Sequence, residues 1–186
     1  YDNQVDNYNQ DHYQLHVSHE FSEKLTANAA LHYTKGYGYF EEFKEGQKFA
    51  NYGLNDVMNA SDTITRTDLV RRRWLDNDFY GMTYSINYDP TKKLNFNLGG
   101  GINNYEGDHF GEVIWAEFAS NGFPRENYYE STAQKFDANV YLKTNYIVNN
   151  KLSVMADLQI RQINYKTKGN DNDLRTFDID ESYTFF

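Results

Sequence analysis

The stretch GMTYSINYDPTKKLNFNLGGGI, residues 81–102, alternates apolar and polar residues on both sides of a polar break. Successive side chains of a β-strand point to opposite faces, so this pattern predicts two strands that each have one apolar and one polar face. The break at 89–93 has turn chemistry, because proline fixes one backbone dihedral and Asp89 can bond its own backbone. The stretch therefore predicts a β-hairpin whose apolar residues are Met82, Tyr84, Ile86 and Tyr88, then Leu94, Phe96, Leu98 and Ile102.

The same pattern recurs around a break at 22–24 and around another at 148–151, and a further strand begins near Phe177. About seven strands are therefore expected, in an antiparallel up-and-down order. The connections at 36–70 and 106–131 are long and rich in Gly, Asn and charge, whereas compact soluble domains use connections of about 4 to 6 residues. Short turns that alternate with long loops are typical of a transmembrane β-barrel with periplasmic turns and extracellular loops.

Composition agrees with that class. The chain has 186 residues, a net charge of -9, no cysteine, 17 Tyr and 13 Phe, yet its mean hydropathy is only -0.85. A barrel strand gives a weak hydropathy signal because only alternate residues meet lipid. No run approaches the roughly 20 apolar residues of a membrane helix. The acidic balance and the short basic run Arg71–Arg73 argue against a nucleic-acid partner.

Aromatic residues gather near the ends of the expected strands. Two aromatic girdles at the membrane interfaces would produce this distribution. A soluble β-sandwich also alternates, but it accounts for neither the girdles nor the two classes of connection. The expected girdle residues are Phe21, Tyr88 and Tyr146 near the short turns, and Tyr33, Trp74 and Tyr105 towards the long loops.

Several long phrases, among them DNYNQDHYQLHVSHEFSEKL, LVRRRWLDNDFYGMTYSINY and GGGINNYEGDHFGEVIWAEF, resemble the barrel region of TonB-dependent outer-membrane receptors of Gram-negative bacteria. The resemblance implies a 22-stranded barrel in the cell outer membrane that imports a scarce ligand such as a siderophore, haem or cobalamin. Residues 1–186 would form part of that β-barrel, without the plug domain and the TonB-contacting segment. The implied partners are the plug domain of the same protein, TonB, outer-membrane lipid and the small-molecule ligand.

Two stretches, YTKGYGYFEEF and HFGEVIWAEF, concentrate aromatic rings near the expected extracellular end. Exposed rings can stack on sugars, catechols or macrocycles, so these stretches are the candidates for ligand binding. The alternative is that the rings anchor the loops at the lipid boundary or pack the loops on each other. The ligand-binding candidates are Tyr37, Tyr39, Phe40, Phe110 and Trp115.

Charged residues of opposite parity to the apolar rows are expected to face the lumen, because a charge on the lipid face costs about 2 to 4 kcal/mol at the bilayer midplane. In the last expected hairpin this set would contact the plug. The acidic stretch 169–181 fits either a solvated turn or a surface calcium site, and Asp178 and Asp180 are predicted to face the lumen. The plug-facing candidates are Lys135, Asp137, Lys143, Asp157 and Arg161.

Neither an enzyme nor a metal or cofactor site is expected. His12 and His16 stand four residues apart, which on a strand separates them by about 13 Å. The pair Glu41-Glu42 has no nucleophile or polarising donor predicted beside it. The competing interpretation is a soluble or surface β-rich binding module, for carbohydrate in particular, that uses the same aromatic residues.

Overall fold

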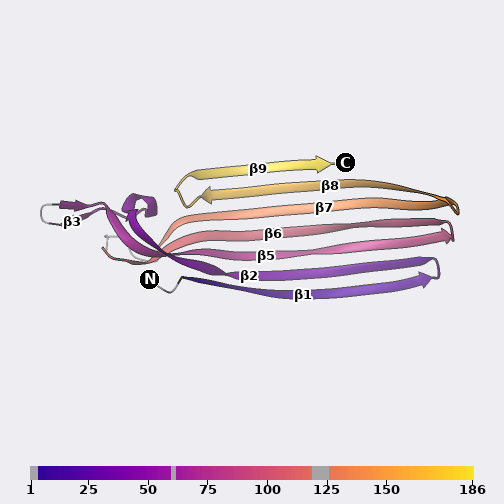
Figure 1. Cartoon of the computed structure of the whole chain (residues 1–186), viewed down its shortest axis with the longest axis horizontal. Helices are drawn as coiled ribbons and strands as arrows, with labels where there is room; N and C mark the ends of the chain where they lie inside the picture. The colour runs from indigo at the N-terminus through magenta and orange to yellow at the C-terminus, as the bar shows by residue number, and fades with distance from the viewer. Residues whose placement is uncertain (1–3, 60–61, 119–125) are drawn as a thin grey trace.

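The computed structural model describes residues 4–59, 62–118 and 126–186, and most of them lie in one antiparallel sheet of seven strands (Figure 1). The strands follow each other across the sheet in chain order, which confirms the predicted all-β, up-and-down arrangement. In the chain, a short 3-10 helix η1 and a two-stranded ribbon of β3 and β4 come between β2 and β5, which are neighbours in the sheet. The sheet strands are β1 (Val5–Ser22), β2 (Leu25–Lys48), β5 (Arg66–Thr91), β6 (Leu94–Ala116), β7 (Asn127–Asn149), β8 (Leu152–Asn170) and β9 (Thr176–Phe185); the others are η1 (Phe49–Tyr52), β3 (Val57–Asn59) and β4 (Asp62–Ile64).

Three tight hairpins join strands at one end of the sheet, which we call the turn end (Figure 1). They connect β1 to β2, β5 to β6, and β7 to β8, at the three places where the sequence predicts short turns. The middle turn is shorter than predicted, because β5 continues through Asp89 and Pro90 to Thr91. A register shift between Tyr88 and Thr91 accommodates the proline, in keeping with its usual restriction to strand edges and bulges.

The opposite end of the sheet, the loop end, differs from the prediction. Long loops are expected at 36–70 and 106–131, but β2 extends to Lys48, β5 starts at Arg66, β6 extends to Ala116 and β7 starts at Asn127. Polar residues there continue the ladder, since Glu41 lies opposite Arg72 and opposite charges across strands stabilise pairing. Residues 119–125 lie outside the described part of the chain.

The register confirms that one face of the sheet collects the apolar rows. Ile86 lies opposite Leu98, Leu98 opposite Leu142, and Leu142 opposite Leu158. Directly opposed residues share a face, so these strands turn their apolar rows to one side, the apolar face. The other side, the polar face, carries the intervening residues such as Asn139, which lies opposite Gly101 and Arg161.

Strand β9 does not follow the predicted faces. Ile179 lies opposite Thr167 and Tyr183 opposite Ile163, on the polar face, whereas Asp178 and Asp180 lie opposite Lys168 and Lys166 on the side of the apolar face. The prediction that Asp178 and Asp180 face the lumen is therefore wrong. Alternation gives the period of a strand, but the connection between β8 and β9 sets its register and hence its face.

Buried hydrophobic residues are confined to the loop end. Leu69 and Phe49 are fully buried, and η1 contacts β2 there. Elsewhere, each described strand of the sheet packs against its sheet neighbours, and no second layer of the described chain covers either face. The other buried hydrophobic residues in the described chain are Tyr52, Val70, Val113, Tyr128 and Tyr129.

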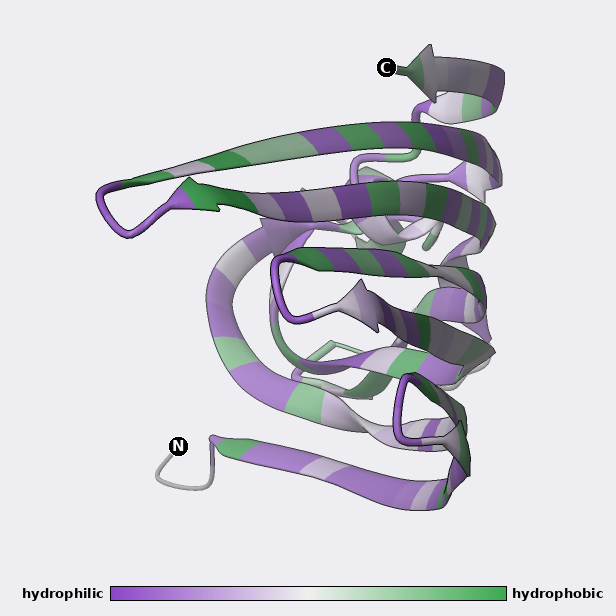
Figure 2. Cartoon of the chain, turned by 90° about the vertical axis from the view of Figure 1, so that its right-hand side faces the viewer, coloured by the Kyte–Doolittle hydropathy of each residue, from purple (hydrophilic) through white to green (hydrophobic). Residues whose placement is uncertain are grey.

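The sheet curls strongly when seen along its strands (Figure 2), and hydrophobic and hydrophilic residues alternate along them as bands. It is an open sheet whose outermost strands are β1 and β9. Among the described helical residues, none belongs to a helix with the length and apolar character needed to cross a bilayer.

Two neighbouring glycines give a test of this packing. A Cβ added at Gly100 would lie 2.2 Å from the backbone oxygen of Asn139, whereas at Gly101 the nearest atom would be 3.3 Å away. We expect Gly100→Ala to push β6 away from β7 and to destabilise that pairing by about 1 to 3 kcal/mol. Gly101→Ala should change it little. Amide hydrogen exchange of residues 138–142 measures the difference, and equal protection in the two variants would contradict the register.

Candidate functional site

The most prominent surface is a continuous apolar belt on the apolar face, interrupted only by His19, Gly100 and Thr144. Most of its large side chains are exposed, with Leu158 73% and Leu15 57% exposed, and the others are partly exposed. Contiguous apolar patches this wide are rare on soluble monomers and mark an interaction surface. The belt consists of alternate residues of 13–21 in β1, 25–33 in β2, 80–88 in β5, 94–102 in β6, 136–146 in β7 and 154–160 in β8.

Aromatic rings border the belt at both ends. At the loop end Tyr13 lies opposite Tyr33 and Tyr33 opposite Tyr80, and Phe136 continues the row through Asn104. At the turn end Tyr88 lies opposite Phe96, with ring centroids 6.5 Å apart. Phe96 lies opposite Thr144 of β7, and Tyr146 follows two residues after Thr144. The predicted girdles therefore correspond to two rows, of which the first contains Tyr33 and the second Tyr88 and Tyr146.

Two residues predicted for the loop-end girdle lie elsewhere. Tyr105 lies opposite Phe79 and Lys135, which places it on the polar face. Trp74 is on the apolar face but six residues beyond Tyr80 along β5. Alternation along a strand shows which of its residues share a face. How far a residue lies from the residues of a neighbouring strand depends on the register between the two strands, which the sequence does not show.

Immediately beyond the loop-end aromatic row, the same face becomes charged. Lys35 Nζ lies 2.6 Å from Asp76 and 3.0 Å from Asp78, and Lys166 lies 2.8 Å from Asp180. In β1, β2 and β5 this change from an aromatic to a charged residue takes two residues along the strand, from Tyr13 to Asp11, from Tyr33 to Lys35 and from Tyr80 to Asp78. The row, in sheet order, is Asp11, Lys35, Asp78, Glu106, Gln134, Lys166 and Asp180, in which Gln134 is the one uncharged residue.

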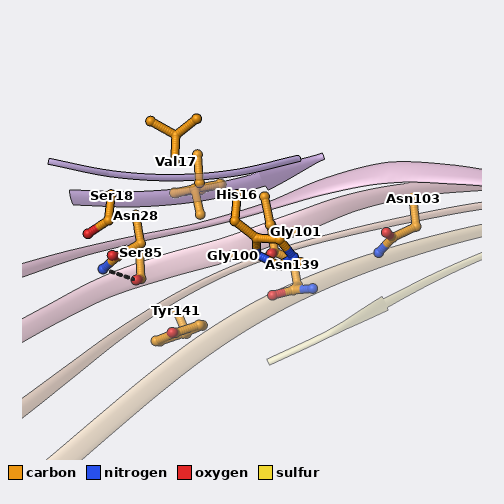
Figure 3. A pocket seen from close by; sticks show the side chains of 14 residues that line it. His16, Val17, Ser18, Asn28, Ser85, Gly100, Gly101, Asn103, Asn139 and Tyr141 are labelled. Atoms are coloured by element: carbon orange, nitrogen blue, oxygen red, sulfur yellow. Dashed lines mark hydrogen bonds between the residues drawn. The ribbon is translucent and has the colours of Figure 1, made fainter. Parts of the chain in front are cut away.

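The polar face is hollowed over β1 to β7, with a volume of about 660 Å³ (Figure 3). Its lining combines the short polar side chains of Ser18, Asn28, Ser85, Asn103 and Asn139 with His16, Tyr84 and Tyr141, and Asn28 Nδ2 donates to Ser85 Oγ at 3.4 Å. The ring of Tyr141 occupies the space beside Gly99, where an added Cβ would be 2.5 Å from its hydroxyl. Gly99 and Gly101 lie on the polar face, opposite Tyr141 and Asn139, and Gly101 lines the recess.

The five plug-facing candidates all lie on the polar face of β7 and β8, as the parity argument predicts. Lys143 lies opposite Asp157, and their charged groups are 3.9 Å apart. Arg161 Nε donates to Asp137 Oδ1 at 2.9 Å, and Lys135 Nζ lies 3.9 Å from Asp137. The set is therefore a row of ion pairs on one wall. Whether it contacts a plug stays a prediction.

The ligand-binding candidates are split between the two faces and lie in strands, not in loops. Phe40 lies opposite Arg73 on the polar face, while Tyr39 lies opposite Trp74 on the apolar face. Phe110 also lies opposite Trp74. The loop placement was wrong because β2 and β6 continue past the apolar belt, and alternation then separates neighbouring rings. By the same register, Tyr37 accompanies Tyr39, and Trp115 lies opposite Val70 near the end of β6.

Phe40 borders a second hollow on the polar face near the loop end, with a volume of about 380 Å³. Tyr8, Arg73, His109 and Tyr129 also line it. Arg73 Nε donates to Tyr129 Oη at 3.4 Å, and its guanidinium carbon is 5.9 Å from that ring centroid. Burial lowers the pKa of His109, so its imidazole is neutral at pH 7. Aromatic rings around one cation can hold a planar or anionic small molecule.

Arg73, His109 and Tyr129 were not among the sequence candidates. They come from three strands, and only the register brings them together. The one signal along the chain was the basic run Arg71–Arg73, whose guanidinium groups can bind lipid phosphates or form ion pairs with carboxylates. The structure has the ion pairs, because Arg71 bonds Glu42 and Arg72 Nε lies 2.7 Å from Glu41 Oε2.

The Arg71–Glu42 pair supports the small core at the loop end. Arg71 Nη1 also donates to Tyr52 Oη at 3.2 Å. Burial tends to raise the pKa of Glu42, but hydrogen bonds from Lys44 and Arg71 outweigh it and hold the pKa below its usual range. Burial raises the pKa of Tyr128 in the same core to about 12. Both groups therefore keep their pH 7 charge states across the neutral range.

In the described residues there is no group of three or more His, Cys, Asp or Glu side chains placed to hold a metal ion. His12 Nδ1 lies 2.9 Å from Thr34 Oγ1, and His16 Nε2 lies 3.2 Å from Gln14 Oε1. No protein-family model and no curated protein matches the chain.

The depressed pKa of Glu42 predicts how the loop-end core responds to acid. The stabilisation is complete above the ordinary carboxyl pKa of about 4 and is lost as the pH falls through the lower pKa of folded Glu42. We expect the protection of the Leu54 amide, which donates to Phe49 O at 3.1 Å, to fall with acidification after correction for intrinsic exchange.

The matched variant is Glu42→Gln, which leaves Arg71 without its charged partner. It should lower protection at pH 7, by up to about 3 kcal/mol, and should remove most of the acid dependence. Acid dependence that persisted unchanged in Glu42→Gln would assign the effect to another carboxyl group.

Proposed function

We propose that the chain is part of the wall of an outer-membrane β-barrel, and that this barrel is a TonB-dependent transporter importing a scarce small-molecule ligand. The observation that carries the proposal is the exposed apolar belt between two aromatic rows. In a soluble protein this surface would be exposed to water along its whole width. The free-energy cost of that exposure is about 25 cal/mol per Å² of apolar area. In a bilayer it meets hydrocarbon, and the aromatic rows meet the two interfaces.

The height of the belt supports a bilayer as its partner. In β7 the belt runs from Tyr146 to Phe136, ten residues apart, or about 33 Å along the strand at about 3.3 Å per residue. A strand tilt of about 40° reduces this to about 25 Å, the usual height of the apolar band on outer-membrane barrels. The charged row beyond Tyr33 and Tyr80 then lies in the headgroup layer.

The open edges fit the same proposal. β1 and β9 each have one unpaired side, and closure into a barrel is the arrangement that removes sheet edges altogether. In a 22-stranded barrel, further strands of the full-length protein would pair with β1 and β9. The sheet is strongly curled (Figure 2), which is in keeping with such closure, and in a closed barrel the polar face with its two hollows would face the lumen.

The transport role is supported by the polar face and by the resemblance of the sequence to TonB-dependent receptors. The ion-pair row with Asp137 and Arg161 offers the plug domain a polar wall, and energy would reach the plug through TonB. The hollow with Phe40, Arg73 and Tyr129 lies beyond the belt, at the extracellular end of this arrangement, where an incoming ligand is captured. The ligand would be a siderophore, haem, cobalamin or similar molecule.

Two adjacent residues of β8 test the membrane placement. Leu158 lies near the middle of the belt, whereas Gln159 lies opposite Tyr141 on the polar face. Leu158→Arg should cost about 2 to 4 kcal/mol in a bilayer and sharply reduce the folded protein in the outer-membrane fraction. Gln159→Arg should assemble at the wild-type level, because Gln159 is also exposed but faces the lumen.

The same pair separates the proposal from a soluble binding module. Leu158 is 73% exposed, so in a soluble protein either arginine would change stability by no more than about 0.5 kcal/mol. Equal recovery of both variants, in the soluble fraction, would overturn the membrane placement.

A further inference from the structure

A cluster of aromatic rings lies on the apolar face beyond the belt, in strands whose other face carries the second hollow; two of its residues, Tyr39 and Trp74, also border that hollow. We call this cluster the outer aromatic platform, and it consists of Tyr37, Tyr39, Trp74 and Phe110. Trp74 is its centre: its ring centroid is 5.2 Å from that of Tyr37, 4.6 Å from Tyr39 and 5.8 Å from Phe110, with the Phe110 ring nearly parallel. Tyr37 remains 48% exposed, so the rings form a surface and not a core.

The platform faces away from the lumen. Tyr39, Trp74 and Phe110 lie opposite one another across three strands, and the residues next to them, Phe40 and Arg73, point to the polar face. A ligand held in the hollow beside Phe40 and Arg73 would be separated from the platform by the sheet itself. The platform therefore has a different partner from the transported ligand.

The platform also lies beyond the hydrocarbon layer. Tyr37 and Tyr39 follow Tyr33 of the loop-end aromatic row by four and six residues, which is about 10 to 15 Å of height on a strand tilted by about 40°. Lys35 and Asp78 lie between the two, and Asp76, which completes this ion-pair cluster, lies opposite Tyr37. Rings below that cluster meet acyl chains, and rings above it meet whatever surrounds the barrel outside the bilayer core.

The polar groups that frame the platform favour an uncharged polar partner. Arg72 lies over the Tyr39 ring, 4.1 Å from its centroid, and its Nε is 2.7 Å from Glu41 Oε2. Trp74 Nε1 donates to Glu112 Oε1 at 2.9 Å. The positive charge of Arg72 is thus outnumbered by carboxylates, which repel phosphates but accept hydrogen bonds from hydroxyls.

We propose that the outer aromatic platform binds neutral sugar residues in the headgroups of the glycolipid that surrounds the barrel. The apolar faces of the sugar rings stack on Tyr37 and Phe110, and their hydroxyls donate to Glu112, which is partly exposed, whereas Glu41 is buried beneath Arg72. This inference rests on the proposed membrane placement for the source of the sugar. The stacking itself depends only on the four rings.

The test uses the full-length protein in a glycolipid-free detergent and the core oligosaccharide released from outer-membrane glycolipid by mild acid. Saturation-transfer NMR reports the binding. For the wild-type protein we expect saturation transfer to the ring protons of the sugar. For Tyr37→Ala we expect at least a fivefold loss of affinity for the oligosaccharide. Tyr37→Phe keeps the ring and should bind as the wild type does. Phe40→Ala, on the opposite face one residue from Tyr39, should also leave binding unchanged.

Two outcomes would overturn the inference. One is the absence of saturation transfer from the wild-type protein to the sugar ring protons. The other is a loss of binding in Phe40→Ala but not in Tyr37→Ala, which would place the sugar in the lumen as a transported ligand. The amount of each variant in the outer-membrane fraction shows that it assembles. That fraction, together with Leu158→Arg, reports on the membrane placement separately, so failure of one proposal is distinguishable from failure of the other.

Discussion

The property on which every surface of this protein depends is an uninterrupted antiparallel register across the middle of seven strands. A slip of one residue in any pairing would move a whole row of side chains to the other face. The register shifts occur near strand ends, at Glu20/Ser22, Tyr88/Thr91 and Ile147/Asn149 by the turns and at Lys44/Gln47, Val70/Arg71 and Gly111/Glu112 by the loop end. Between them, the ladders from β1 to β8 keep one face apolar and the other polar, whereas β9 turns its apolar residues to the polar face.

The sequence predicts the parts of the fold that depend on local alternation. The hairpins around residues 23, 92 and 150 follow from apolar rows that meet at short polar breaks. Strand length does not follow, because the ladder continues into polar residues such as Glu41 and Arg72, whose pairing across strands is invisible along the chain. The face of β9 was also mispredicted. Its rows alternate clearly, but the choice between two faces depends on its register with β8.

The same distinction explains which site residues could be anticipated. Lys143 and Asp157 lie in strands whose apolar parity is strong, so their common face follows from the sequence. Phe40 and Tyr39 are neighbours in the chain, and a stretch interpreted as a loop gives no reason to separate them. Arg73 and Tyr129 meet across 56 residues, and only the pairing of β5, β6 and β7 brings them together.

The outline of the belt carries one further argument. On β2 the belt ends at Tyr33, but on β8 it ends at Ile160, and the register relates Ile160 through Val140, Gly100 and Tyr84 to Ala29. The border is level from β2 to β7, because Tyr33, Tyr80, Asn104 and Phe136 lie in one row, and it drops by four residues between β7 and β8, where Phe136 lies opposite Asn164. The polar residues Gln162, Asn164, Ser182 and Thr184 of β8 and β9, which are hydrogen-bonded to one another, occupy the apolar face beyond this step. The belt therefore ends early on β8 because the side chains change from apolar to polar, since the register with β7 is continuous through this stretch.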